Sequence, residues 1–250
     1  MTRFLTSTVA AAALAFGFSA VASAQPVKNI VLVHGAFADG SGWRAVTDIL
    51  QKDGYNVSIV QEPETSLADD AAATKRAIEQ VNAPLILVGH SYGGAVITEA
   101  GNEPRVKGLV YIAAFQPDTG ETLGALLQKT PPAANSAIPA GKGYVIVDPA
   151  KFHADFAADL PVKEANFMAI SQVPISVTGF GTPITDAAWK HKKSWYAVAT
   201  DDRMINPEME RMMAKRAGST TIKIKGSHAI YMSQPQAVAK LIEKAARDAE

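Results

Sequence analysis

A serine lies at the centre of the pentapeptide Gly89-His90-Ser91-Tyr92-Gly93. The apolar run Leu85 to Val88 precedes this motif directly, and a stretch rich in small residues follows it. A G-x-S-x-G sequence between a strand and a helix is typical of a sharp, strained turn that exposes the serine hydroxyl at the carboxyl end of a sheet. We therefore predict that Ser91 is a nucleophile, with an ordinary glycine-rich turn as the structural alternative.

A serine hydroxyl is a weak nucleophile at neutral pH, so it needs an adjacent general base. We predict that His228 is this base, because it follows the apolar run Ile222 to Ile224 and precedes the last amphipathic stretch. The chain order serine, acid, histidine is then one that catalytic triads use. The remaining histidines occupy less suitable positions: His34, His90, His153 and His191.

The third member of a triad is an acid that fixes the tautomer of the histidine and stabilises its protonated form. The acid should follow the penultimate strand, where the run Tyr196 to Ala199 leads into two aspartates. We favour Asp202 because it lies farther into the loop, whereas Asp201 could simply form part of the turn. Asp118, after an earlier strand, is a third and more distant candidate.

Acyl transfer also requires two donors for the oxyanion that develops on the substrate. Backbone amides supply them, and we predict the N–H of Tyr92, next to the nucleophile, and that of Ala36, in the loop 34–43 after the first strand. The glycines of this loop could instead indicate phosphate binding. Their spacing matches neither G-x-G-x-x-G nor a P-loop, so we expect no bound nucleotide or other cofactor.

The elements that position these residues form an alternating pattern of predicted strands and helices. Apolar runs without strict alternation are typical of strands buried on both faces, as in a parallel sheet covered by helices. Six predicted strands are Ile30 to Val33, Val57 to Val60, Leu85 to Val88, Leu109 to Ala113, Tyr196 to Ala199 and Ile222 to Ile224. Five predicted helices are Trp43 to Lys52, Leu67 to Val81, Gly93 to Asn102, Pro207 to Ala217 and Pro235 to Ala246. The pattern indicates an α/β fold with about six mostly parallel strands.

The segment from Gln116 to about Thr185 interrupts this alternation, because it contains several prolines and glycines and no clear strand. Long irregular segments inside a compact domain are usually functional. We predict that residues 116–185 form a small, partly helical cap over the sheet, with residues 130–143 as its mobile part. A loose surface excursion is the alternative.

Composition excludes several classes of function. The chain has no cysteine, which rules out disulfides, a thiol nucleophile and cysteine-ligated metal. It also lacks an H-E-x-x-H motif, so we predict no metal site. The formal net charge is zero, which gives no long-range attraction to nucleic acid or to an anionic membrane. The expected partner is therefore a small, fairly apolar molecule, whereas the oligomeric state stays open.

The N-terminal segment is typical of a secretory signal peptide. Arg3 supplies the positive region, the stretch from Val9 to Val21 is apolar, and Ala22-Ser23-Ala24 supplies the small residues of a cleavage site. The apolar stretch is shorter than a membrane span requires. We predict cleavage of residues 1–24, export to the periplasm or the medium, and one mature domain over residues 25–250.

These motifs, taken together, resemble a group of α/β-hydrolases that contains plant methyl esterases, hydroxynitrile lyases and related bacterial esterases. The resemblance covers nearly all of the mature chain except residues 119–185. The matching segments are Val31 to Ala36, Leu87 to Gly94, Tyr111 to Asp118 and Gly226 to Pro235. The resemblance implies an α/β-hydrolase fold and a carboxylesterase-like activity that cleaves a small apolar ester through an acyl-enzyme.

Three alternatives share this fold. Hydroxynitrile lyases of the group resemble one another in a lysine after the catalytic histidine and a threonine after the first-loop histidine, where this chain has Ala229 and Gly35. A binding protein without chemistry would not need an intact triad. A membrane-associated lipase could turn cap residues toward lipid, but they are scattered and we expect them in the core or lining a pocket: Phe152, Phe156, Phe167 and Met168.

Overall fold

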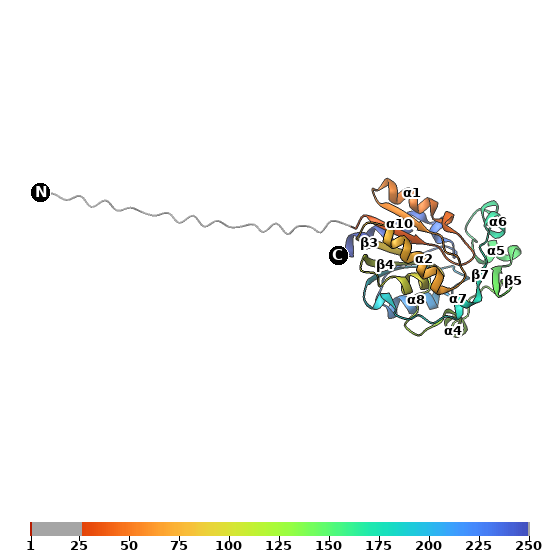
Figure 1. Ribbon diagram of the computed structural model, residues 1–250. Helices are drawn as coiled ribbons and strands as arrows, with labels where there is room; N and C mark the ends of the chain where they lie inside the picture. Colours follow the sequence, from red (N-terminus) through yellow and green to blue (C-terminus); the bar gives the residue numbers. More distant parts are fainter. Residues whose placement is uncertain (2–26, 250) are drawn as a thin grey trace.

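A six-stranded sheet forms the centre of the molecule in the computed structural model, which describes residue 1 and residues 27–249 (Figure 1). The strand order is β2-β1-β3-β4-β8-β9, and every neighbouring pair is parallel. The strands are β1 (Asn29–Val33), β2 (Asn56–Val60), β3 (Leu85–His90), β4 (Val106–Ile112), β8 (Lys193–Ala199) and β9 (Thr220–Ile224). All six predicted strands are therefore present. Apart from Met1, the predicted signal peptide lies outside the described residues.

Helices cover both faces of this sheet, as the apolar strand pattern predicts (Figure 1). On one face α1 (Arg44–Lys52) packs against α10 (Pro235–Asp248), and on the other α2 (Leu67–Gln80) packs against α3 (Gly93–Ala100). The fifth predicted helix, α8 (Pro207–Arg216), packs on β8. Prolines occupy the first turn of α8 and α10, where a missing N–H costs nothing.

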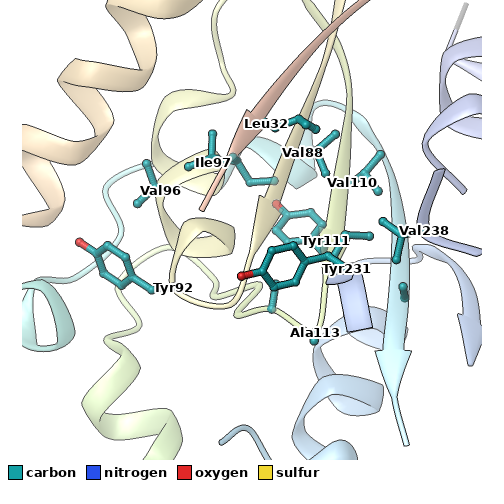
Figure 2. Packing of buried hydrophobic residues seen from close by; sticks show 14 of the residues in the cluster. Leu32, Val88, Tyr92, Val96, Ile97, Val110, Tyr111, Ala113, Tyr231 and Val238 are labelled. Carbon is teal, nitrogen blue, oxygen red and sulfur yellow. The ribbon is translucent and has the colours of Figure 1, made fainter. Parts of the chain in front are cut away.

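The central strands are mostly buried. Every residue of β3 is buried, and most of its neighbours in register on β1 and β4 carry aliphatic side chains. Figure 2 shows Leu32, Val88 and Val110 on three neighbouring strands, with Val238 of α10 close to them. This packing fixes the positions of the carboxyl ends of β1, β3 and β4 relative to one another. The loops that follow these three strands therefore begin at fixed positions on one edge of the sheet.

Residues 116–185, the predicted cap, lie at one end of the sheet, and the expectation that this segment has no clear strand is wrong (Figure 1). It contains a three-stranded antiparallel sheet of β5 (Ala137–Gly141), β6 (Tyr144–Val147) and β7 (Ile175–Ser176). The edge strand β5 is exposed throughout and contains Pro139, which the edge of a sheet tolerates. The cap helices are α4 (Leu123–Lys129), α5 (Pro149–Asp155), α6 (Val162–Ile170) and α7 (Val177–Gly181).

Short elements complete the described chain. The 3-10 helix η1 (Gly40–Trp43) follows β1, η2 (Ala188–Lys190) precedes β8, and α9 (Ile230–Ser233) connects β9 to α10. Within the described residues, no helix has the length and the apolar character that crossing a bilayer requires.

Candidate active site

Ser91 lies on the sharp turn between β3 and α3, as the pentapeptide predicts. Its backbone has a φ of 53°, in the left-handed region that non-glycine residues rarely adopt. A Cβ on Gly89 would lie 2.4 Å from the Gly93 carbonyl oxygen, and one on Gly93 would lie 2.2 Å from that of His34. Both positions therefore require glycine. The backbone of this turn is strained at Ser91, and neighbouring backbone atoms pack closely against the glycines on either side. Backbone strain of this kind concentrates at functional sites.

The structure brings together Ser91, His228 and Asp202, which are distant in sequence. His228 Nε2 lies 2.8 Å from Ser91 Oγ, and His228 Nδ1 lies 2.6 Å from Asp202 Oδ2. All three residues are buried. The carboxylate therefore holds the proton on Nδ1, which leaves Nε2 free to accept the serine proton. This is the geometry that a general base and its orienting acid need.

The two neighbouring aspartates have different surroundings. Asp202 Oδ1 accepts hydrogen bonds from the N–H groups of Met204 (2.7 Å) and Ile205 (2.9 Å), which fix its side chain inside the loop. Asp201 is exposed, and its N–H donates to the Gly226 carbonyl (3.0 Å) in the histidine loop. Only Asp202 contacts the imidazole. Asp118 lies elsewhere, in an ion pair with Lys190.

A cavity of about 320 Å³ opens beside Ser91 and His228. Both residues predicted as oxyanion donors, Ala36 and Tyr92, line it. The rest of its wall is mainly apolar and comes from the end of β4, the cap and the Asp202 loop: Phe115, Leu127, Val145, Phe180, Met204 and Ile205. Pockets that bind small organic molecules have this size and this character.

A family model described as the alpha/beta hydrolase family matches residues 30–241. The chain belongs to the alpha/beta hydrolase family. Among curated relatives, pyrethroid hydrolase of Sphingobium wenxiniae is 28% identical over 247 residues, 86% of either chain. Methylesterase 8 of Arabidopsis thaliana is 26% identical over 117 residues, 41% of this chain and 43% of that protein.

Solved structures of alpha/beta hydrolases share the fold. An extracellular alpha/beta-hydrolase from a Paenibacillus species, described as similar in structure and function to tobacco salicylic acid binding protein 2, superposes with a TM-score of 0.72. That match has 21% identity and covers 88% of this chain and 99% of the other. The predicted resemblance to the methyl esterase group is thus confirmed.

Two buried residues of this alpha/beta hydrolase flank the triad and were not predicted. His90 Nε2 lies 2.9 Å from the His228 carbonyl oxygen, and burial, followed by the nearby His228, lowers the pKa of His90 well below its usual range. Glu210 Oε2 accepts from the Ala199 N–H (3.1 Å), and burial, followed by the charge of Asp202, raises the pKa of Glu210 well above its usual range. Burial therefore favours the neutral form of both groups beside the triad.

A cap residue also reaches the histidine loop of the alpha/beta hydrolase. The Asp159 carboxylate accepts hydrogen bonds from the Ser227 N–H (3.0 Å), the Ser227 hydroxyl (2.5 Å) and the Ser233 hydroxyl (2.8 Å). Desolvation acts to raise the pKa of Asp159, but these hydrogen bonds together outweigh it and lower the pKa. Because Ser227 precedes His228, this contact connects the cap to the position of the imidazole. No sequence pattern relates residues that are 68 positions apart in this way.

A buried acidic cluster lies behind the first loop. His34, Glu62 and Glu64 offer possible metal-ligand atoms within 4.8 Å of one another. However, His34 Nε2 accepts from the Glu62 N–H (3.0 Å), and His34 Nδ1 lies 3.1 Å from the Gly35 carbonyl oxygen. The neutral ring must therefore carry its proton on Nδ1, the nitrogen nearest the carboxyls, and a protonated nitrogen cannot bind a metal. Burial, followed by the charge of Asp70, raises the pKa of Glu64 to about 9.

Proposed function

We propose that this alpha/beta hydrolase is a serine esterase that cleaves small apolar carboxylic esters through an acyl-enzyme. The observation that carries this proposal is the chain of hydrogen bonds from Asp202 through His228 to Ser91, which lies on a strained turn with a φ of 53°. The apolar cavity beside Ser91 provides room for a substrate.

The reaction has two steps in this proposal. Ser91 Oγ attacks the ester carbonyl carbon while its proton passes to His228 Nε2, and the carbonyl oxygen becomes an oxyanion that the N–H groups of Ala36 and Tyr92 stabilise. When the tetrahedral intermediate collapses, the bond to the alcohol oxygen breaks and His228 returns the proton to that oxygen. Water then attacks the acyl-enzyme with His228 again as base, which releases the acid and restores the serine.

Two kinds of support favour an ester over the alternatives. The two curated relatives described above are named as a pyrethroid hydrolase and a methylesterase. The lyase alternative lacks a cation for expelled cyanide, because the residue after His228 is Ala229, which is fully buried. For the lipase alternative, Phe152 and Phe156 are buried in the core and Met168 packs against it, whereas Phe167 of α6 has 67% of its surface exposed.

The proposal is tested by labelling purified protein with a fluorophosphonate and measuring turnover of p-nitrophenyl esters, with Ser91→Ala as the variant. Wild-type protein should be labelled at Ser91 and should hydrolyse the esters, and Ser91→Ala should lose at least about a thousandfold in kcat. Thermal melting checks that the variant is folded. An unlabelled wild-type protein, or full turnover by folded Ser91→Ala, would refute the proposal.

We also propose that the protein is exported after cleavage near Ala24, on the basis of the N-terminal sequence alone. Sequencing the N-terminus of protein recovered from the periplasm and from the medium tests this. A mature start near Gln25 is expected, and recovery of the uncleaved chain from the cytoplasm only would contradict it.

A further inference from the structure

Asp70 is a buried acid that takes no direct part in the proposed reaction. It lies in the first turn of α2, and both of its carboxyl oxygens accept hydrogen bonds. Oδ2 accepts from the Tyr92 hydroxyl (2.7 Å), and Oδ1 accepts from the Glu64 N–H (2.8 Å). Burial raises the pKa of Asp70, although both donors act to lower it. Within residues 27–249 no lysine, arginine or histidine forms an ion pair with this acid. Burying such a group is costly, so a benefit to function is worth seeking.

The hydroxyl that Asp70 binds belongs to the residue after the nucleophile. Tyr92 follows Ser91, and its N–H is one of the two predicted oxyanion donors. In Figure 2 the Tyr92 hydroxyl points away from the other labelled residues. Gly179 of α7 lies close against it, because a Cβ on Gly179 would be 2.9 Å from the hydroxyl oxygen. A hydrogen bond from a hydroxyl to a carboxylate is about twice as strong as one between neutral groups. The bond to Asp70 thus fixes the far end of the Tyr92 ring.

The peptide plane between Ser91 and Tyr92 contains both the Ser91 carbonyl and the Tyr92 N–H. On the serine side, the Ser91 carbonyl oxygen accepts from the N–H groups of Gly94 and Phe115, both at 3.0 Å. On the other side, the Tyr92 N–H has to stay free to meet the oxyanion. A strained φ such as that of Ser91 persists only where the surrounding contacts fix it. The Tyr92 side chain, held by Asp70, supplies such a contact on the side where the backbone N–H cannot.

The other oxygen of Asp70 connects this turn to the cap. Glu64, which donates its N–H to Asp70, has a φ of 53°, and its carbonyl oxygen accepts from the Ser176 N–H of β7 (2.9 Å). One carboxyl group therefore joins α2, the nucleophile turn and an edge of the cap. Asparagine could not replace it fully, because its amide has one acceptor oxygen and its NH₂ group would face the second donor.

We propose that Asp70 is a positioning residue of this hydrolase, which holds the Tyr92 ring and thereby keeps the Tyr92 N–H directed at the oxyanion. Asp70 does not line the cavity beside Ser91, so it acts through Tyr92 and not by contact with the substrate. The inference rests on the proposed esterase function and adds to it a remote residue on which oxyanion stabilisation depends. A negative charge on Asp70 would itself oppose an oxyanion, so positioning and charge have opposite effects on kcat.

The experiment compares Asp70→Asn with the matched control Asp69→Asn on purified full-length protein. Asp70→Asn should lower kcat for a p-nitrophenyl ester by about ten- to a hundredfold and change KM by less than about twofold, because oxyanion donors act in the transition state. The Ki of a trifluoromethyl ketone, which adds to Ser91 and forms an oxyanion, should rise by the same factor. The Asp69 side chain is exposed and bonds only to Thr65 and Ser66, so Asp69→Asn should change neither value.

Titration of the active serine with a fluorophosphonate separates positioning from a merely structural role. A variant that only folds less well has fewer active sites, but kcat per active site and Ki stay the same. Tyr92→Phe removes the hydroxyl alone and keeps the test decisive if Asp70→Asn does not fold. It should lower kcat and raise Ki by about the same factor as Asp70→Asn, and the double variant should lose no more than the weaker single variant, since one bond is removed in each.

Several results would overturn the inference while leaving the esterase function intact. These are an unchanged or higher kcat per active site in Asp70→Asn, a fall in kcat without the matching rise in Ki, or losses that add in the double variant. If Asp70→Asn does not fold, an unchanged kcat or Ki in Tyr92→Phe has the same meaning. If wild-type protein neither hydrolyses the ester nor binds the ketone, the proposed function itself fails, and this inference with it.

Discussion

The carboxyl edge of the main sheet and the cap above it are built differently. At the sheet edge, Ser91, Asp202 and His228 each follow a strand, and all are buried. In the cap, β5 is exposed along its whole length, and α6 carries Phe167 and Ile170 with 67% and 80% of their surface exposed. The first region places the hydrogen-bonded atoms of Asp202, His228 and Ser91 2.6 and 2.8 Å apart, whereas the second contributes apolar side chains to the wall of the cavity beside Ser91. In the proposed function, the sheet edge carries the chemistry and the cap contributes to the choice of substrate.

The largest expected effect lies at the sheet edge and separates the two aspartates. Asp202→Asn keeps the shape of the side chain but allows the wrong tautomer of His228, so kcat should fall by about four decades with little change in KM. Asp201→Asn is the matched control, because its exposed side chain does not contact the imidazole, and it should cost less than about tenfold. Steady-state kinetics on both folded variants measure this. If Asp201→Asn is the more damaging variant, the acid is misassigned.

The same division explains which features the sequence could predict. The positions of Ser91, Asp202 and His228 after three strands of the main sheet were predictable, because strands are local patterns. The preference for Asp202 over Asp201 agrees with the two backbone N–H groups that surround its Oδ1. The strands β5 to β7 were harder to predict. The strands β5 and β6 form a local hairpin, but β5 has neither alternation nor burial, and β6 pairs with the distant β7 through Tyr144 and Ser176. The contacts of His90 and Asp159 depend on partners 138 and 68 positions away.

The next prediction tests whether the cap also serves the chemistry. Asp159→Asn removes the charge that holds Ser227, so the histidine loop should lose part of its order and kcat should fall by roughly tenfold, with KM much less affected. Asp148→Asn is the matched control: Asp148 caps α5 through the Ala150 N–H, asparagine caps equally well, and no loss is expected. Equal kcat in both variants would mean that the cap does not position His228.

A smaller effect is expected where the loop after β2 meets the cap, at Glu64, whose carbonyl oxygen accepts from the Ser176 N–H of β7 (2.9 Å). Burial raises the pKa of Glu64 to about 9, so the folded protein holds a proton that the unfolded chain releases near pH 4.5. The contribution of protonated Glu64 to the free energy of unfolding is therefore fully present below about pH 4.5, and it is lost as the pH rises toward 9. Glu64→Gln imitates the protonated acid and should be more stable than wild type at pH 9, by about 1 to 3 kcal/mol, or roughly 2 to 10 °C in Tm. The advantage should disappear at pH 4.5. A difference that does not depend on pH would show that Glu64 is not protonated in the fold.

The smallest expected effect is that of chelators, and it tests the same buried cluster. His34, Glu62 and Glu64 lie close enough to hold a metal, but the proton of neutral His34 sits on Nδ1, the nitrogen that faces the carboxyls. Protonated carboxyls also bind metals poorly, and burial raises the pKa of Glu62 well above its usual range. Prolonged dialysis against EDTA should therefore change kcat/KM by less than about twofold and leave Tm unchanged, because the proposed mechanism uses only side chains and backbone amides. Metal analysis of the protein before and after dialysis is the control. Inactivation that zinc reverses would mean that the cluster binds a metal and that the tautomer of His34 is the opposite one.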